Sequence, residues 1–166
     1  MKALLLIAVA AMAVTSAEAD ATTDFIKSLE GFSPTPYECR SGGRTIGYGS
    51  TSPALLARGY VTEAEAAGEL RRACDRIAAR LRSAMGLGSV LKPNEETAVV
   101  SFIYNVGWGA FARSTLCARL KRGERGATVA AEFGRWKYVT NRSGRKEVSA
   151  GLVKRRRREA SMFQGL

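Results

Sequence analysis

The order of apolar and polar residues predicts a mostly helical chain that is interrupted once by strand-like sequence. Residues 25–30 (FIKSLE) follow three potential N-caps at residues 22–24 and end before Gly31, which indicates a short helix closed by a left-handed turn. Residues 34–36 carry two prolines and exclude helix. Residues 37–51 are rich in Gly, Thr, Tyr and Ile, which favours a small antiparallel sheet.

Helical periodicity dominates the remainder of the chain. Thr62 and Glu65 have the spacing of a capping box, and apolar residues recur at helical spacing from Leu70 to Leu81, so we expect a long helix to about Met85. Pro93 is placed to open the next helix. Further helices are predicted near 93–105, 113–121, 126–137 and 149–163. No repeat or long linker divides the chain, so we expect an α+β fold. In it, a long helix joins a small β-containing N-terminal lobe to a mostly helical C-terminal lobe.

The first 19 residues have the features of an export signal. A basic residue at position 2 precedes an apolar run over residues 3–14, and Ala17-Glu18-Ala19 has the form of a cleavage site. The run is shorter than the ~20 residues that span a bilayer comfortably. Two interpretations remain: a cleaved signal peptide, or an uncut anchor that contacts the inner membrane transiently and is then released. Both place residues 22–166, the expected catalytic domain, in the periplasm.

The balance of charge narrows the class of partner. The 166-residue chain has 26 Lys and Arg against 15 Asp and Glu, a formal net charge of +11, which favours an anionic partner. An export signal argues against nucleic acid, and the basic residues are spread along the chain rather than clustered with aromatics. We therefore expect an anionic cell envelope as the partner and a monomeric protein.

Three cysteines occur in a compartment that permits disulfides. Cys39, Cys74 and Cys117 allow one bridge and leave one thiol over. The favoured pairing, Cys74–Cys117, would tie the long helix to the helical lobe. A bridge that includes Cys39 is the alternative, and Cys74 also fits a small buried apolar residue on its helical stripe.

The absence of histidine removes several kinds of chemistry. Ser-His-Asp and Cys-His hydrolysis both need an imidazole base, and structural zinc sites are disfavoured because the cysteine spacing is wrong as well. No phosphate-binding loop is present, and we expect neither a metal nor a cofactor. Acid–base chemistry by carboxyl groups remains, and glycosidic bonds are its main substrates.

Three segments carry a resemblance to a known family. Glu30, Cys39 and Thr45 have the spacing Glu-x8-Cys-x5-Thr and are followed by Ile46-Gly47-Tyr48-Gly49. The later segments are residues 101–116, SFIYNVGWGAFARSTL, and residues 151–157, GLVKRRR. In this order and spacing, over residues 22–163, the chain resembles the phage-type lysozymes (endolysins), whose motif is Glu-x8-Asp/Cys-x5-Thr. The resemblance implies a lysozyme-like fold. It also implies cleavage of peptidoglycan between N-acetylmuramic acid and N-acetylglucosamine during host lysis.

The resemblance also implies roles for individual residues. Glu30 would be the general acid, in an apolar setting that raises the pKa of a carboxyl group. Thr45 would position the attacking water, and Cys39 stands where most members have the second carboxylate. Four further residues would line the sugar cleft between the lobes: Tyr48, Tyr104, Asn105 and Ser114. Core packing remains an alternative for both tyrosines, and helix capping for Asn105 and Ser114.

Cys39 leaves the reaction itself open. A thiol with an ordinary pKa of ~8.5 is mostly protonated at neutral pH. It can support hydrolysis by orienting water, which we favour, or leave a glutamate-only lytic transglycosylase, or mark an inactive site. From a different class, a basic protein that binds or disrupts the envelope without catalysis is also consistent with the composition. The basic run from Lys154 to Arg158 is predicted to be a solvated helix face that favours an anionic wall.

Overall fold

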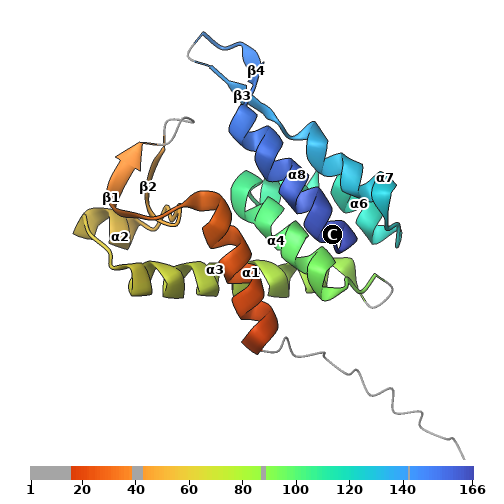
Figure 1. Ribbon diagram of the computed structural model, residues 1–166, viewed down its shortest axis with the longest axis horizontal. Helices are drawn as coiled ribbons and strands as arrows, with labels where there is room; N and C mark the ends of the chain where they lie inside the picture. The colour runs from red at the N-terminus through yellow and green to blue at the C-terminus, as the bar shows by residue number, and fades with distance from the viewer. Residues whose placement is uncertain (1–15, 39–42, 87–88, 142) are drawn as a thin grey trace, which may run out of the picture.

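The protein folds into two lobes joined by one long helix (Figure 1), in a computed structural model that describes residues 16–38, 43–86, 89–141 and 143–166. The helix α1 (Ser16–Glu30) leads into the N-terminal lobe, which contains β1 (Ser33–Glu38), β2 (Arg44–Gly47) and α2 (Pro53–Arg58). The connecting helix is α3 (Glu63–Met85). The C-terminal lobe contains α4 (Pro93–Val106), α5 (Trp108–Ala112), α6 (Thr115–Lys121), α7 (Ala127–Ala130), the 3-10 helix η1 (Ala131–Arg135), β3 (Tyr138–Thr140), β4 (Lys146–Val148) and α8 (Ala150–Gln164). The α+β class and the lobe arrangement predicted from the sequence are confirmed.

The first helix begins earlier than the sequence predicted. It starts at Ser16, so Thr22 and Thr23 lie inside it and do not cap its N-terminus. Thr23 Oγ1 donates to the carbonyl of Ala19 at 2.9 Å, and the Thr22 and Thr97 hydroxyls are 2.7 Å apart, which ties α1 to α4. The threonine hydroxyls therefore use helical and tertiary partners. Within the described residues, no helix is both long and apolar enough to cross a membrane.

The long helix begins where the capping box predicted. Thr62 Oγ1 accepts from the Glu65 backbone N–H, and the Glu65 carboxylate accepts from the Thr62 backbone N–H at 2.9 Å. The hairpin of the N-terminal lobe packs directly on this helix. Gly47, at the end of β2, has φ of 67°, and a Cβ there would lie 2.8 Å from Cβ of Ala66. Close approach of the strand to α3 therefore requires glycine at position 47.

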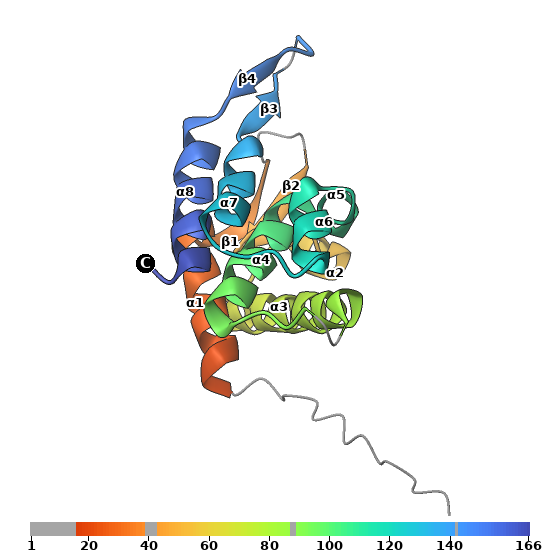
Figure 2. The same cartoon turned by 90° about the vertical axis from the view of Figure 1, so that its right-hand side faces the viewer.

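The sequence did not predict α2, α5 or the β3–β4 hairpin, and it predicted α7 and η1 as a single helix. The helix α2 has Pro53 in its first turn and ends at Gly59, and residues 126–137, predicted as one helix, divide into α7 and η1. The β3–β4 hairpin is antiparallel, with Tyr138 opposite Val148, and it extends from the end of the C-terminal lobe (Figure 2). All of these elements are short, so hydrophobic periodicity carries little information about them.

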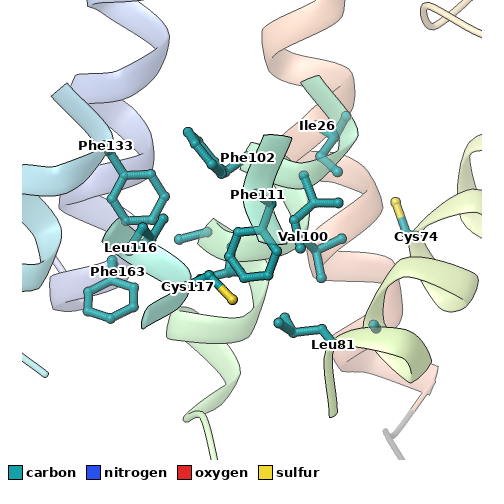
Figure 3. Packing of buried hydrophobic residues seen from close by; sticks show 14 of the residues in the cluster. Ile26, Cys74, Leu81, Val100, Phe102, Phe111, Leu116, Cys117, Phe133 and Phe163 are labelled. Atoms are coloured by element: carbon teal, nitrogen blue, oxygen red, sulfur yellow. The ribbon is translucent and has the colours of Figure 1, made fainter. Parts of the chain in front are cut away.

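The helix α4 is the centre of the core. Almost the whole stretch from Glu95 to Ile103 is buried, and Phe102 packs edge-to-face on Phe133 and on Trp136, with ring centroids 5.4 Å apart in each pair. Side chains of α1, α3, α6 and α8 complete the cluster around it (Figure 3). Because α4 is covered on nearly all sides, its sequence is apolar around most of the helix rather than striped.

The expected disulfide between Cys74 and Cys117 is not formed, and that prediction is wrong. Both thiols are free and buried, Cys74 on α3 and Cys117 on α6. In Figure 3 the two sulfurs are drawn well apart, with Val100 between them in that view. Burial raises the pKa of the Cys74 thiol to about 12 and also raises that of Cys117, so both behave as small apolar residues. Cys39 lies outside the described residues.

Candidate active site

Glu30 is the last residue of α1 and lies where the helix turns into the N-terminal lobe. Gly31, with φ of 71°, ends the helix as predicted. The Glu30 side chain is 18% exposed, and its Oε1 accepts a hydrogen bond from Nη1 of Arg155 on α8. Its Oε2 faces the turn after β2, where a Cβ built on Gly49 would lie 3.5 Å away. Arg155 of the C-terminal lobe therefore binds one oxygen of the carboxylate, and the other oxygen faces residue 49.

Two sequence predictions about this region are wrong. Glu30 does not lie in an apolar setting, because a buried guanidinium contacts it. The run from Lys154 to Arg158 is not uniformly solvated either: Arg155 and Arg156 are only 7% and 2% exposed. The reason is Glu159, which is fully buried between these two arginines and offers an oxygen to each, so their charges are compensated inside the protein.

Tyr104 lies beside Glu30, while Tyr48 is directed elsewhere. Tyr104, on α4, donates its hydroxyl to the backbone carbonyl of Tyr48 at 2.8 Å. Burial, reinforced by the nearby Glu30 charge, raises the pKa of Tyr104 above its ordinary value. Tyr48 is 5% exposed and donates to Glu63 Oε1 at 2.6 Å; burial and this hydrogen bond raise its pKa to about 12. Core packing therefore accounts for Tyr48, while Tyr104 lies between Glu30 and the Tyr48 backbone.

Thr45 is buried on β2, with 8% of its surface exposed, and is paired across the hairpin with Tyr37. Among the described residues, its Oγ1 is the one buried side-chain oxygen or nitrogen that lacks a hydrogen-bond partner. A buried hydroxyl without a protein partner is expected to bind water or a ligand. The position of Cys39, the third member of the predicted triad, lies outside the described part of the chain.

Asn105 and Ser114, both predicted to line the sugar cleft, have different kinds of partner. Asn105, near the end of α4, is exposed, and its Oδ1 accepts from Nη2 of Arg156. Ser114 is buried and caps α6, because its Oγ accepts from the Cys117 backbone N–H at 3.0 Å and donates to the Phe111 carbonyl at 2.6 Å. The structure therefore brings Asn105 into the network that holds Glu30, and it uses the Ser114 hydroxyl to cap a helix.

An open cavity of about 430 Å³ lies between α3 and the segment that follows β2. Three parts of the chain line it. They are the segment from the turn after β2 to the start of α2 (Gly49, Ser50, Thr51, Ser52 and Pro53), the α3 residues Glu69, Ala73 and Arg76, and Tyr104 of α4. Gly49 and Tyr104 belong both to this wall and to the surroundings of the Glu30 carboxylate. The described residues contain no cluster of three or more potential metal ligands. The chemistry available here is that of carboxyl, hydroxyl and guanidinium groups.

The residues that hold Glu30 in place were not among the predicted site residues. Arg155, Arg156 and Glu159 lie 125 or more residues from Glu30 in the chain, so spacing along the sequence does not connect them with it. A weak signal was present, because Glu159 stands three and four residues after the two arginines, which is the spacing of ion pairs on a helix.

Comparison with known proteins gives one consistent result. Residues 27–159 match the family described as phage lysozyme. The chain is 32% identical over 139 residues to the endolysin of Acyrthosiphon pisum secondary endosymbiont phage 1, covering 84% of this chain and 92% of that protein. It is 37% identical over 142 residues to the endolysin of Bacillus phage PZA, covering 84% of this chain but about half of that protein, 52%. The solved endolysin of Escherichia coli O157:H7 phage FAHEc1 superposes with a TM-score of 0.73 at 29% identity, covering 92% and 94% of the two chains.

A more distant relative carries a different name. The protein from Bacteriophage PS119 named SAR-endolysin is 30% identical over 129 residues, covering 77% of this chain and 72% of that protein. The family match spans both lobes and includes Glu30, Thr45 and Arg155. The chain belongs to the phage lysozyme family, and it is a glycoside hydrolase that degrades peptidoglycan.

Proposed function

We propose that the protein hydrolyses the β-1,4 bond between N-acetylmuramic acid and N-acetylglucosamine, with Glu30 as the general acid. The observation that carries this proposal is the asymmetric environment of the Glu30 carboxylate. Arg155 occupies Oε1, while Oε2 has no hydrogen-bond partner among the described residues and faces Gly49 beside the open cavity. A general acid needs one oxygen within hydrogen-bond reach of the leaving group, and Oε2 is free for that task.

Arg155 orients the acid. Its guanidinium donates to Glu30 Oε1, to the Ser101 carbonyl at 3.1 Å and to Glu159 Oε1 at 3.0 Å. A planar guanidinium with several fixed donors restricts the rotation of the carboxylate that it binds. Oε2 is thereby kept at the wall that Gly49 and Tyr104 share, where a glycosidic oxygen would receive the proton.

Water is expected to be positioned on the side of the N-terminal lobe. The buried Thr45 hydroxyl has no hydrogen-bond partner among the residues that the structure describes, which supports a role in holding the attacking water. Cys39 stands where most members of the family have a carboxylate, and we assign it to the same water. A thiol orients water with a weak donor or acceptor, so this side of the reaction relies on placement rather than on charge.

Sugar binding is assigned to Tyr104 and Asn105. Arg156 occupies Asn105 Oδ1, and because a guanidinium can only donate, the amide nitrogen of Asn105 must face outward. An exposed amide N–H and the face of Tyr104 suit the hydroxyl, acetamido and apolar surfaces of a saccharide. Tyr48 supports Tyr104 through its carbonyl and is not assigned to sugar.

Export is proposed for the same enzyme. The basic start and apolar run over residues 3–14, together with the SAR-endolysin relative, support a periplasmic enzyme that is either cleaved from its leader or released from the membrane. The described α1 starts at Ser16, so cleavage after Ala19 would remove its first turn. N-terminal sequencing of the exported protein distinguishes the two routes, because only cleavage yields a new N-terminus.

The decisive experiment combines the clearing of purified cell wall with analysis of the products. Glu30→Gln should abolish clearing, because an amide cannot donate the required proton, whereas the control Glu38→Gln, at an exposed position on β1, should clear normally. Equal clearing by wild type and Glu30→Gln would reject enzymatic lysis and leave a basic envelope-binding protein. New reducing ends support hydrolysis, and anhydro-muropeptides would instead identify a transglycosylase.

The role of Cys39 has its own test. If the thiol positions water, Cys39→Ala should abolish turnover, and Cys39→Asp should retain it because a carboxylate accepts from water more strongly. Full activity in Cys39→Ala would remove this residue from the mechanism. The role of Glu30 would be unaffected by that result.

A further inference from the structure

The most constrained group outside the proposed reaction is Glu159, in the middle of α8. It is fully buried, and every partner that the structure gives its carboxylate is a donor. Oε1 accepts from the Ser101 hydroxyl at 2.8 Å and from Arg155 Nε at 3.0 Å, and Oε2 accepts from Arg156 Nη1. Ions held this completely inside a protein are costly to bury, and a whole buried ion network can often be replaced by apolar residues of similar volume without loss of stability. The presence of this network next to the active site therefore points to a role beyond folding.

The two arginines that Glu159 holds point to different parts of the site. Arg155 reaches Glu30, and Arg156 reaches Asn105 while also donating to the Trp136 carbonyl at 3.1 Å. Arg156 in addition lies over the ring of Phe102, 4.8 Å from the centroid. One carboxylate thus fixes both the arginine that touches the proposed acid and the arginine that touches the proposed sugar ligand.

Arg155 and Arg156 bring two positive charges into this cluster, and Glu159 is the carboxylate that contacts both of them. Glu30 contacts Arg155 and, as the general acid, gives up a proton in the reaction, so the steady compensation of the two arginines depends on Glu159. Without the charge on Glu159, both buried guanidinium groups have Glu30 as their remaining carboxylate. Arg156 would then be drawn away from Asn105 and compete for the oxygens of Glu30, including Oε2, which the reaction needs free.

We infer that Glu159 is a positioning residue of the active site: its buried carboxylate holds Arg155 on Glu30 Oε1 and Arg156 on Asn105. The inference rests on the proposed function, because that function assigns the roles of Glu30 and Asn105. Glu159 itself touches neither substrate nor reacting atoms. Its effect passes through Arg155 to the chemical step and through Arg156 to the binding of the sugar.

The test compares Glu159→Gln with a matched variant that loses a similar ion pair elsewhere. Glu132, on η1, is also buried and also lies between two arginines, with Nη1 of Arg119 and of Arg135 each at 3.2 Å. Each variant removes one carboxylate that lies between two arginines. Only Glu159 is linked to Glu30, through Arg155. Kinetics on soluble peptidoglycan oligosaccharides should be measured below the melting temperature of each variant, with circular dichroism as the check of folding.

Glu159→Gln should lower kcat by about 10-fold or more and raise KM, since general acid catalysis is worth ~10²–10⁴-fold and only its positioning is impaired. Glu159→Asp, which keeps the charge, should recover part of kcat. Glu132→Gln should lose thermal stability with kcat and KM unchanged. If both glutamine variants keep wild-type kinetics, or if both lose activity only in proportion to unfolding, Glu159 is merely structural and the inference is wrong.

A second pair of variants keeps the inference falsifiable if Glu159→Gln does not fold. Arg155→Lys should lower kcat with little change in KM, because a lysine cannot bind Glu30, Ser101 and Glu159 together. Arg156→Lys should raise KM with little change in kcat, because it loses Asn105. Identical effects of the two substitutions would contradict the division of roles. An active Glu30→Gln would refute the proposed function itself, whereas an inactive Glu30→Gln beside a fully active Glu159→Gln refutes only this inference.

Discussion

Substitution of Gly49 by alanine tests whether Glu30 Oε2 is the oxygen that reacts. A methyl group at this position would lie 3.5 Å from Oε2, 3.7 Å from the carboxyl carbon and 3.9 Å from a ring carbon of Tyr104. These are ordinary van der Waals contacts, so the methyl group fits without a clash. It fills the space beside Oε2, however, and a leaving oxygen must come within about 2.6–3.2 Å of the acid to be protonated.

The cost in stability can be separated from the cost in activity. Gly49 has φ of 86°, where an L-residue costs ~1–2 kcal/mol. Gly59, with φ of 77° and no atom within 4 Å of a Cβ, carries the same backbone cost without contacting the site. For a domain of this length, each kcal/mol lowers the melting temperature by about 2–4 °C. Gly49→Ala and Gly59→Ala should therefore melt about 2–8 °C below wild type, by similar amounts.

Only Gly49→Ala should lose activity. Displacement of a reacting group by ~1 Å costs on the order of 10²-fold in rate, so we expect about a 100-fold slower clearing of purified wall, against a wild-type rate for Gly59→Ala. Melting temperatures by circular dichroism and initial rates of turbidity loss measure the two effects. Wild-type clearing by a folded Gly49→Ala would show that Oε2 does not face the scissile bond and would refute the geometry proposed for Glu30.

Three further substitutions or treatments test the fold around the site. Gly47→Ala combines a left-handed backbone with a Cβ only 2.8 Å from that of Ala66, so it should destabilise by about 2–5 kcal/mol, clearly more than Gly59→Ala, in thermal melts. Arg58 and the Thr62 backbone N–H hold the pKa of Glu65 down at about 2, so this carboxylate stabilises α3 above its ordinary pKa and loses that effect as pH falls towards 2. Acid unfolding should show a small advantage of wild type over Glu65→Gln that shrinks over this range; a constant difference would contradict the capping box. Cys74 and Cys117 should resist thiol reagents in the native protein and react on unfolding, and peptide mapping that recovers them as a disulfide would contradict their separation in the core.

Features that depend on neighbouring residues could be predicted from the sequence. The capping box at Thr62 and Glu65, the proline that opens α4, and the glycine that ends α1 just after Glu30 are short-range signals, and each was confirmed. The position of the acid at a helix end followed from them. These features were predictable because a cap or turn satisfies its hydrogen bonds within a few residues, whatever the rest of the chain does.

The surroundings of that acid depend on long-range packing and could not be predicted from the sequence. The Arg155–Glu30 contact joins residues 125 positions apart, and the burial of Arg155 and Arg156 follows from Glu159 lying between them in the core. In the sequence these arginines belong to a basic run that predicts a solvated face. The interior reverses this prediction, because a buried charge is stable only with an opposite charge beside it, and packing alone determines which opposite charge that is.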